Sequence, residues 1–388
     1  MNNTKFSILK FVFYFYILYF LFTLAGSNII DYNDISFKVI LIYSTYVFFL
    51  LLGISIGLKT PRLILKQKII INNIELLSFL LVLFSFSLTI YKLSTVVEYA
   101  GSIKKVIETA DDIRWKFIKR EINLYPLLAG YLTGIQHFSF ALMLVLYISR
   151  KRKIYMFLAV FSFITAILDS FIMFGRVSIL FNIFLLTAIL LINNVKIINI
   201  RNVFIILILI YLLNLPRLIR GSFDNFSATL NKIPIKFHIP NIFNIFLVVF
   251  VYYFSSLYAL DAYLKEDHQL TFGKQLFLPI YNILGRIFGF QTASLYEVPV
   301  YIPFKYNVYT IIKYLIEDFS YLGLVFIPIF YGIVIGNVFK YKTLEFIVLQ
   351  MFFITWIFFT PIYNIFSFGS YFVALLFSFF FAVFFRIK

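Results

Sequence analysis

Long apolar runs alternate with short polar segments along most of this chain. Several runs reach the ~20 apolar residues that a helix needs to cross ~30 Å of hydrocarbon. The pattern therefore predicts an all-α, polytopic integral membrane helix bundle of about 10 transmembrane helices, in a single transmembrane domain over residues 1–388. The predicted helices are 8–25, 37–58, 74–93, 125–148, 154–174, 177–194, 198–214, 319–339, 343–361 and 366–385.

The run at 242–260 is also long enough to span. A single crossing there would turn the basic segment KYKT (340–343) and the basic C-terminus outward, against the retention of Lys and Arg in the cytoplasm. We therefore predict an interfacial helix at 242–260, or a re-entrant pair formed with 275–290, which protein must surround. A total of about 11 or 12 spans is the alternative.

The segments between the runs differ in charge. The basic ones are 59–68, 149–153, 193–202 and 340–343, together with both chain ends. Since cytoplasmic loops carry the excess of Lys and Arg, both termini are predicted to be cytoplasmic. Two long segments, 94–124 and 214–318, then lie outside. The first has apolar residues three or four apart, which predicts an amphipathic helix on the outer membrane surface. The second far exceeds the length of a mere connection, which is typical of functional loops.

Composition narrows the chemistry. The 388 residues are 62% hydrophobic with a formal charge of +17, but most Lys and Arg lie in short clusters between apolar runs, so we expect no nucleic-acid partner. The absence of cysteine excludes disulfides and thiol nucleophiles. No Walker A, HExxH or Gly-x-Ser-x-Gly motif is present, and the histidines lack metal-ligand spacing. We therefore expect neither a metal nor a cofactor, with Asp111 and Asp112, or Glu317 and Asp318, as the pairs that could hold a metal in the alternative.

Charged residues at the outer ends of apolar runs are the first candidates for a site. Arg176 ends the run in SFIMFGRVSILF, and Asp169 lies seven residues earlier, on the same helix face. Both are costly in hydrocarbon unless paired or facing a polar cavity. They form a cationic wall for a substrate that carries phosphate, or else Arg176 reaches the outer headgroups and Asp169 is satisfied by a neighbouring helix.

Two more arginines follow the seventh run. Arg217 and Arg220 are three residues apart, on adjacent turns if the helix continues past Pro216. Guanidinium forks bind phosphate oxygens in pairs, which favours a diphosphate ligand. Anchoring to outer-leaflet lipid is the alternative.

The last candidate segment is YNVYTIIKYLIEDFSYLGLVFIPIFYGIVIG (306–336). Asn307 and Tyr309 precede Asp318 at the predicted membrane entry, and glycines follow where helices pack closely. Asp318 is either a reactive group or a helix cap.

The chain resembles the O-antigen polymerases, the Wzy-type oligosaccharide repeat-unit polymerases of the bacterial inner membrane. The residues that carry the resemblance are FGRVSIL, RLIRGSF, YYFSSLYALDAYL and the segment from NVYT to the glycine-containing helix. Ser320 departs from the family, in which a glycine often follows the aspartate-aromatic pair.

The resemblance implies a GT-C-like periplasmic glycosyltransferase that joins undecaprenyl-diphosphate-linked oligosaccharides. Its expected partners are that lipid-linked glycan, the bilayer and a chain-length regulator protein. The catalytic candidates are Asp318, Arg176 and Arg220, and the substrate-binding candidates are Arg217, Asp169, Tyr309, Asn307, Arg286, Glu297 and His268. A base must take the acceptor proton, for which Asp318, Glu297, His268 and Asp169 are candidates. A flippase or other transporter, and an O-antigen ligase, remain the alternative functions.

Overall fold

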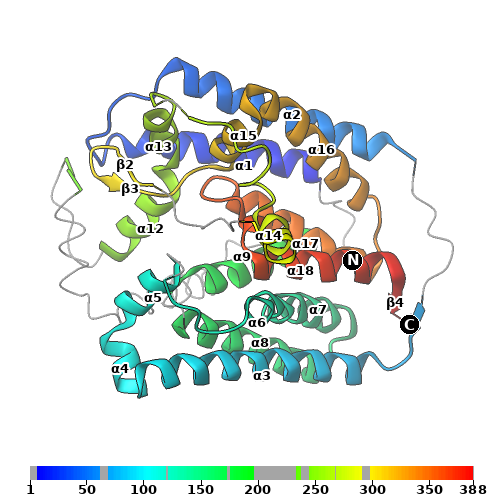
Figure 1. Cartoon of the computed structure of the whole chain (residues 1–388). Coiled ribbons are helices and arrows are strands. Elements are labelled where there is room, and N and C mark those ends of the chain that lie inside the picture. Colours follow the sequence, from blue (N-terminus) through cyan, green and yellow to red (C-terminus); the bar gives the residue numbers. More distant parts are fainter. Residues whose placement is uncertain are drawn as a thin grey trace.

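The computed structural model describes residues 7–61, 69–118, 121–172, 175–195, 233–236, 244–266, 268–290 and 298–387. Most of these residues are helical, and the long helices lie side by side in a bundle (Figure 1). Two short two-stranded sheets accompany them: β1 (Ile69–Ile71) with β4 (Phe385–Ile387), parallel, and β2 (Val300–Tyr301) with β3 (Lys305–Tyr306), antiparallel. The predicted all-α polytopic architecture is confirmed at this level.

Within the described residues, seven segments are long and apolar enough to cross a membrane. They contain α1 (Ile8–Gly26), α2 (Phe37–Lys59), α3 (Ile74–Ala100), α6 with α7 (Leu127–Leu132, Ile135–Arg150), α8 (Lys153–Ile172), α12 with α13 (Asn244–Phe254, Ser256–Tyr263), and α15, η2 and α16 (Ile311–Phe319, Ser320–Leu322, Gly323–Val338). Three shorter apolar helices complete the set: α9 (Val177–Ile192), α17 (Leu344–Phe359) and α18 (Gly369–Phe384). The predicted helix at 198–214 lies outside the described residues.

Two segments differ from the sequence expectation. The run at 242–260 forms α12 and α13, and its part from Phe246 to Tyr263 has the length and hydropathy of a span, although an interfacial or re-entrant helix was expected. The helix expected at 319–339 begins earlier, at Ile311, and changes direction at Ser320, whose φ is +54°. A residue with positive φ cannot continue a right-handed helix, so α15 ends there and a separate helix follows.

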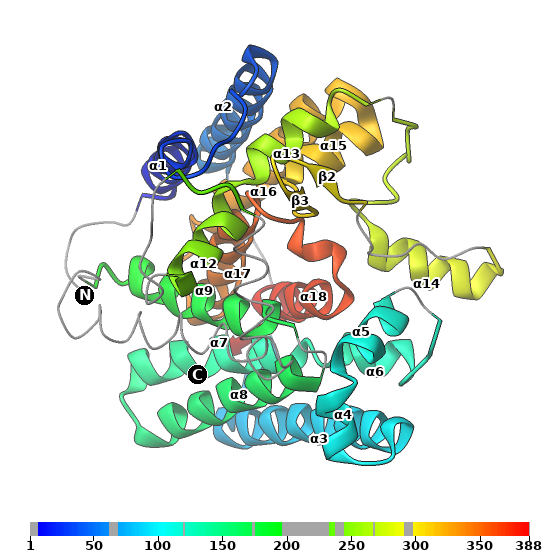
Figure 2. The same ribbon diagram turned by 90° about the vertical axis from the view of Figure 1, so that its left-hand side faces the viewer.

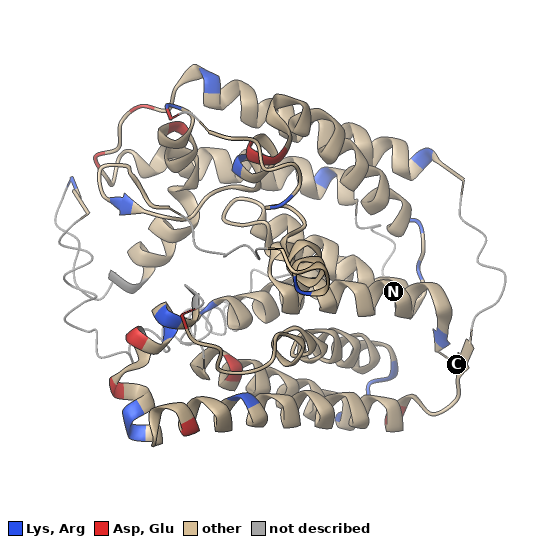
Figure 3. Ribbon diagram, in the orientation of Figure 1, with Lys and Arg blue, Asp and Glu red and all other residues tan. Residues whose placement is uncertain are grey.

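The two ends of the bundle differ in charge (Figure 3). At one end, which we call the basic end, the Lys340 ammonium donates to the Thr60 carbonyl, and the backbone N–H of Ile387 donates to Glu345. The pairing of β1 with β4 also joins the chain after α2 to the C-terminal strand. These contacts gather segments that the charge pattern assigns to one side of a membrane.

The opposite end, which we call the outer end, holds the segments that the sequence predicts to be outside. They are the loop after α1, the short helices α4 (Ile103–Glu108) and α5 (Ala110–Ile118), and the β2–β3 hairpin (Figure 1). The arrangement is consistent with the charge sorting, while the orientation in the membrane stays a prediction.

Helices α2 and α16 approach each other unusually closely. Each carries two glycines four residues apart, Gly53 and Gly57 on α2, and Gly332 and Gly336 on α16. A Cβ atom added at Gly332 would lie 2.4 Å from the carbonyl oxygen of Leu50. Only glycine, whose side chain is a single hydrogen atom, permits the two backbones to lie this close. Small residues commonly allow such close packing between helices in membranes.

We expect Gly332→Leu to weaken this packing, because the helices must separate to admit the new side chain. Overpacking of a close contact costs about 1–3 kcal/mol. The unfolding temperature of the purified protein in detergent should therefore fall. Phe330→Leu is the matched control, since Phe330 lies on the same helix with 61% of its surface exposed. Equal unfolding temperatures for Gly332→Leu and the parent chain would contradict the account.

Candidate functional site

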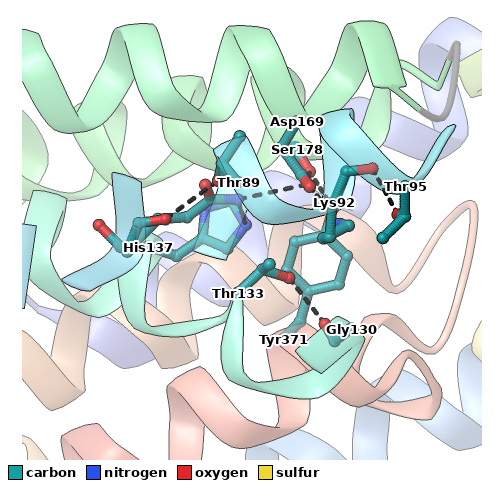
Figure 4. Close-up of polar contacts among 11 residues, drawn as sticks. Thr89, Lys92, Thr95, Gly130, Thr133, His137, Asp169, Ser178 and Tyr371 are labelled. Carbon is teal, nitrogen blue, oxygen red and sulfur yellow. Dashed lines mark hydrogen bonds and ion pairs between the residues drawn. The ribbon is translucent and has the colours of Figure 1, made fainter. Parts of the chain in front are cut away.

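An ion pair is buried between two long helices. Lys92 on α3 is 3% exposed and Asp169 on α8 is 8% exposed, and the Lys92 ammonium contacts the Asp169 carboxylate (Figure 4). Each charge alone would be strongly unfavourable in apolar surroundings, so each compensates the other. The pair therefore fixes the position of α3 against α8.

Hydrogen bonds extend from this pair to three more helices. The Ser178 hydroxyl of α9 donates to Asp169 over 3.1 Å and lies 3.0 Å from the Tyr371 hydroxyl of α18. The Gln136 amide of α7 donates to the same carboxylate over 3.4 Å. One residue further on, His137 contacts the Asn182 amide oxygen through Nδ1 at 2.7 Å. The polar network of Figure 4 thus holds five helices in register around one carboxylate.

A cavity of about 330 Å³ adjoins this network at the outer end. Its walls come from α3, α5 and α6, from the segment between α5 and α6, from the end of α8 and the start of α9, and from α14 (Leu278–Phe288) and the start of α18. Its polar lining residues are Lys92, Arg114, Asn123, Tyr125, Tyr131, Thr133, Asp169, Ser170, Ser178, Asn282, Arg286, Ser367, Ser370 and Tyr371. We call it the cationic cavity, because its described lining residues include three cationic side chains and one carboxylate.

Helix α14 forms one wall of the cationic cavity. It lies across the bundle, since it is seen end-on in Figure 1 and lengthwise in Figure 2. Leu278, Asn282 and Arg286 follow at intervals of four residues and line the cavity, so they share one helix face. The opposite face carries Ile280 and Leu284, each 40% exposed.

The distribution on α14 differs from that on a water-soluble surface helix, because the polar Asn282 is buried while the apolar Ile280 and Leu284 face outward, and the exposed Arg286 lines the cavity. Within a membrane bundle this pattern suits contact with lipid. The helix therefore separates the cationic cavity from the predicted lipid phase by a single layer of backbone.

One polar atom in the cavity wall is left without a partner among the described residues. The Ser170 side chain is 2% exposed, lines the cavity and makes no hydrogen bond through its hydroxyl. Buried hydroxyls are normally satisfied, so an unsatisfied one beside a cavity suits a ligand or water at that point.

Arg176 lies beside the cavity. It is half-buried, its neighbours Gly175 and Val177 line the cavity, and its guanidinium carbon is 4.9 Å from the ring centroid of Tyr252. The Tyr252 hydroxyl donates to that of Tyr363 over 3.0 Å. Burial raises the pKa of Tyr363, against the opposing positive charges of Arg114 and Arg176, so its phenol stays neutral. Of the predicted site residues, the structure thus brings Arg176, Asp169 and Arg286 together.

Asp318 lies outside the cationic cavity, and both of its carboxylate oxygens accept hydrogen bonds. One carboxylate oxygen accepts from the Thr271 hydroxyl and from the backbone N–H of Gln275 at 3.1 Å, and the other accepts from the N–H of Leu276 at 2.7 Å. The residue is completely buried and does not line the cavity. This geometry favours a structural role, in which Asp318 fixes the chain that leads into α14.

The remaining candidates do not line the cationic cavity. The Tyr309 hydroxyl donates to the Val298 carbonyl over 2.6 Å, and the His268 ring stacks on Tyr263 with centroids 3.5 Å apart. Asn307 is exposed next to the hairpin. Arg217, Arg220 and Glu297 lie outside the described residues, so their predicted roles stay predictions.

Sequence reasoning missed Lys92 and Arg114. Lys92 is a single cation within an apolar run, one residue before the predicted helix end, so the argument applied to Asp169 also applies to it. Arg114 falls in the predicted amphipathic segment, where it reads as one of several residues on a polar face.

Comparisons of the chain with protein families, characterised proteins and solved structures found no match. Among the described residues, no group of three or more His, Asp and Glu side chains is arranged to hold a metal.

A double-mutant cycle tests the buried pair. Lys92→Met leaves Asp169 without its cation, and removing one partner of a buried pair costs about 3–5 kcal/mol. Asp169→Asn should also destabilise the protein, since it leaves Lys92 buried without a counter-charge. The double variant should recover much of the loss, as judged from thermal unfolding of all four proteins. A double variant as unstable as the two single losses combined would show that the residues act independently.

Proposed function

We propose that this chain is a glycosyltransferase of the bacterial inner membrane that polymerises undecaprenyl-diphosphate-linked oligosaccharide repeat units into a surface polysaccharide. The observation that carries the proposal is the charge of the cationic cavity, where Lys92, Arg114 and Arg286 surround a single carboxylate. Three cationic side chains in the lining of one cavity, at the predicted outer side, suit a ligand with several negative charges.

The leaving group of this reaction is a diphosphate. When the anomeric C–O bond breaks, the bonding electrons leave with the phosphate oxygen, and fixed guanidinium groups stabilise the charge that develops there. We assign this role to Arg286 and Arg114, with Arg176 at the edge of the cavity. Glycosyl transfer of this kind requires no nucleotide, which agrees with the missing nucleotide-binding motifs.

The acceptor sugar must lose a proton as its hydroxyl oxygen attacks the anomeric carbon. Of the described residues that line the cavity, only Asp169 carries a carboxylate. We assign the base to Asp169, which accepts the hydroxyl proton, while Lys92, Ser178 and Gln136 hold its oxygens in place. The sequence-based preference for Asp318 is given up, because Asp318 does not line the cationic cavity.

The geometry favours polymerisation over transport. A transporter site lies near the middle of the bundle and opens alternately to each side. Several described helices contribute residues near one of their ends to the cationic cavity, and α5, at the outer end, contributes Arg114 and Phe117. An O-antigen ligase would use the same cavity with a different acceptor, and product analysis separates the two.

Purified protein in liposomes, supplied with a synthetic undecaprenyl-diphosphate-linked repeat unit, tests these roles. We expect Arg286→Ala to slow chain extension by about 10²–10³-fold, the typical effect of removing a donor to a developing negative charge. Arg286→Lys should recover part of the rate, because an ammonium keeps the charge but loses the fork. Asp169→Asn should abolish extension.

The control for a general loss of positive charge is Lys342→Ala, at the exposed basic end. It should extend chains like the parent protein. Asp318→Asn should lower the unfolding temperature and slow extension less than Asp169→Asn does, because it loosens the chain that leads into α14 but leaves the base in place. Normal extension by both Arg286→Ala and Asp169→Asn would refute the proposed mechanism.

A further inference from the structure

A second cavity, of about 280 Å³, lies at the outer end. We call it the hairpin cavity, because residues of the β2–β3 hairpin form one side of it and α13 and the loop after α1 form the other. Its volume is close to the lower limit of ~300–1,000 Å³ for small-molecule sites. No residue of this cavity takes part in the roles assigned above.

Aromatic rings line much of the hairpin cavity. Tyr32 and Tyr258 stack with their centroids 3.9 Å apart, at an angle of 11°. Tyr301, on the hairpin, is 77% exposed, although its neighbours Val300 and Ile302 are buried. Because successive side chains of a strand point to opposite faces, the Tyr301 ring points outward at the rim of the hairpin cavity. An exposed ring on an ordered hairpin offers a flat, preformed surface to a ligand.

The polar groups of the hairpin cavity are mainly acidic. Asp261 and Glu266 carry carboxylates, and the one cation, Lys265, lies 2.9 Å from an Asp261 oxygen. The other Asp261 oxygen accepts from the Ser36 hydroxyl. The exposed Glu266 and Asn33 complete the polar lining. The charge balance is the opposite of that in the cationic cavity, so this site disfavours a phosphate group.

We propose that the hairpin cavity binds uncharged sugar residues of the glycan chain, at a distance from the diphosphate. This inference rests on the proposed function, since it assigns a place to the glycan of the same substrate. The carbon-bound hydrogens on one face of a sugar ring pack against Tyr301, and sugar hydroxyls donate to Glu266 and to the Asn33 amide oxygen. An exposed carboxylate or amide oxygen accepts a hydrogen bond from a sugar hydroxyl, and this contact requires no charge on the ligand.

Tyr252 of helix α12 contacts residues near both cavities. The Tyr306 hydroxyl, on the hairpin side, donates to the Tyr252 carbonyl over 2.8 Å. The Tyr252 ring lies under Arg176, whose neighbours line the cationic cavity. One substrate can therefore engage both sites, with its diphosphate in the cationic cavity and sugars several residues away in the hairpin cavity. Such a second contact would hold a growing chain between additions and increase the length of the product.

Direct binding separates this inference from catalysis. The probe is the neutral oligosaccharide released by mild acid from the synthetic lipid-linked repeat unit, so that it carries neither lipid nor phosphate. We expect it to bind the parent protein in detergent, measured by calorimetry, and to bind Tyr301→Ala and Glu266→Gln roughly three- to tenfold more weakly. Tyr301→Phe should bind like the parent, because it keeps the ring.

Tyr99→Ala is the matched control, since Tyr99 is 50% exposed at the end of α3 and lines neither cavity. Size-exclusion profiles confirm that each variant is folded. The inference is overturned if the oligosaccharide does not bind, or if Tyr301→Ala binds it as tightly as the parent. It is also overturned if Tyr99→Ala reduces the affinity for the oligosaccharide as much as Tyr301→Ala does. Undecaprenyl diphosphate without sugar should not compete with the probe, and competition would also overturn the assignment.

Chain length in cells gives an independent measurement. Tyr301→Ala should shorten the surface polysaccharide ladder, whereas Arg286→Ala should remove it. If the ladder survives Arg286→Ala while oligosaccharide binding depends on Tyr301, the polymerase proposal fails and the sugar site stands. If Arg286→Ala removes the ladder but Tyr301→Ala leaves both ladder length and binding unchanged, the sugar site fails alone.

Discussion

The ion pair between Lys92 and Asp169 is the constraint on which the outer half of the bundle depends. Two charges buried among apolar helices remain there only if they neutralise each other and find further hydrogen bonds. Ser178 and Gln136 supply those bonds, and Tyr371 extends them to α18. Five helices are thus positioned around one carboxylate, and the cationic cavity opens directly beside it.

Besides Lys92, which pairs with Asp169, the cationic side chains among the described lining residues of the cavity are those of Arg114 and Arg286. These two arginines reach it from different elements, α5 and the crossing helix α14. Helix α14 turns its apolar face outward, and Asp318 fixes the chain that precedes it. A residue remote from the cavity thereby determines where a cavity arginine lies. The hairpin cavity, with its acidic lining, is a second site of different chemistry at the outer end.

The apolar runs were sufficient to predict most of the long described helices, because in hydrocarbon every backbone polar group must be satisfied within its own segment. Asp169 and Arg176 were found for a related reason, as charges at the ends of apolar runs. The partner of Asp169 was not found, since Lys92 lies 77 residues away and only packing brings them together. Nor does the sequence indicate that backbone N–H groups more than forty residues earlier donate to the Asp318 carboxylate. It also does not show that Ser320 divides one apolar stretch into two helices.

The central claim is that a cationic cavity on the outer side receives a lipid-linked diphosphate. The chain has no cysteine, so a single Ser370→Cys in the cavity wall can be labelled without background. A membrane-impermeant maleimide added to spheroplasts should modify this cysteine from outside, and undecaprenyl diphosphate should slow the reaction. Lys342→Cys, at the basic end, should react only after permeabilisation. Modification of Ser370→Cys only from inside, or at a rate that undecaprenyl diphosphate leaves unchanged, would contradict the account.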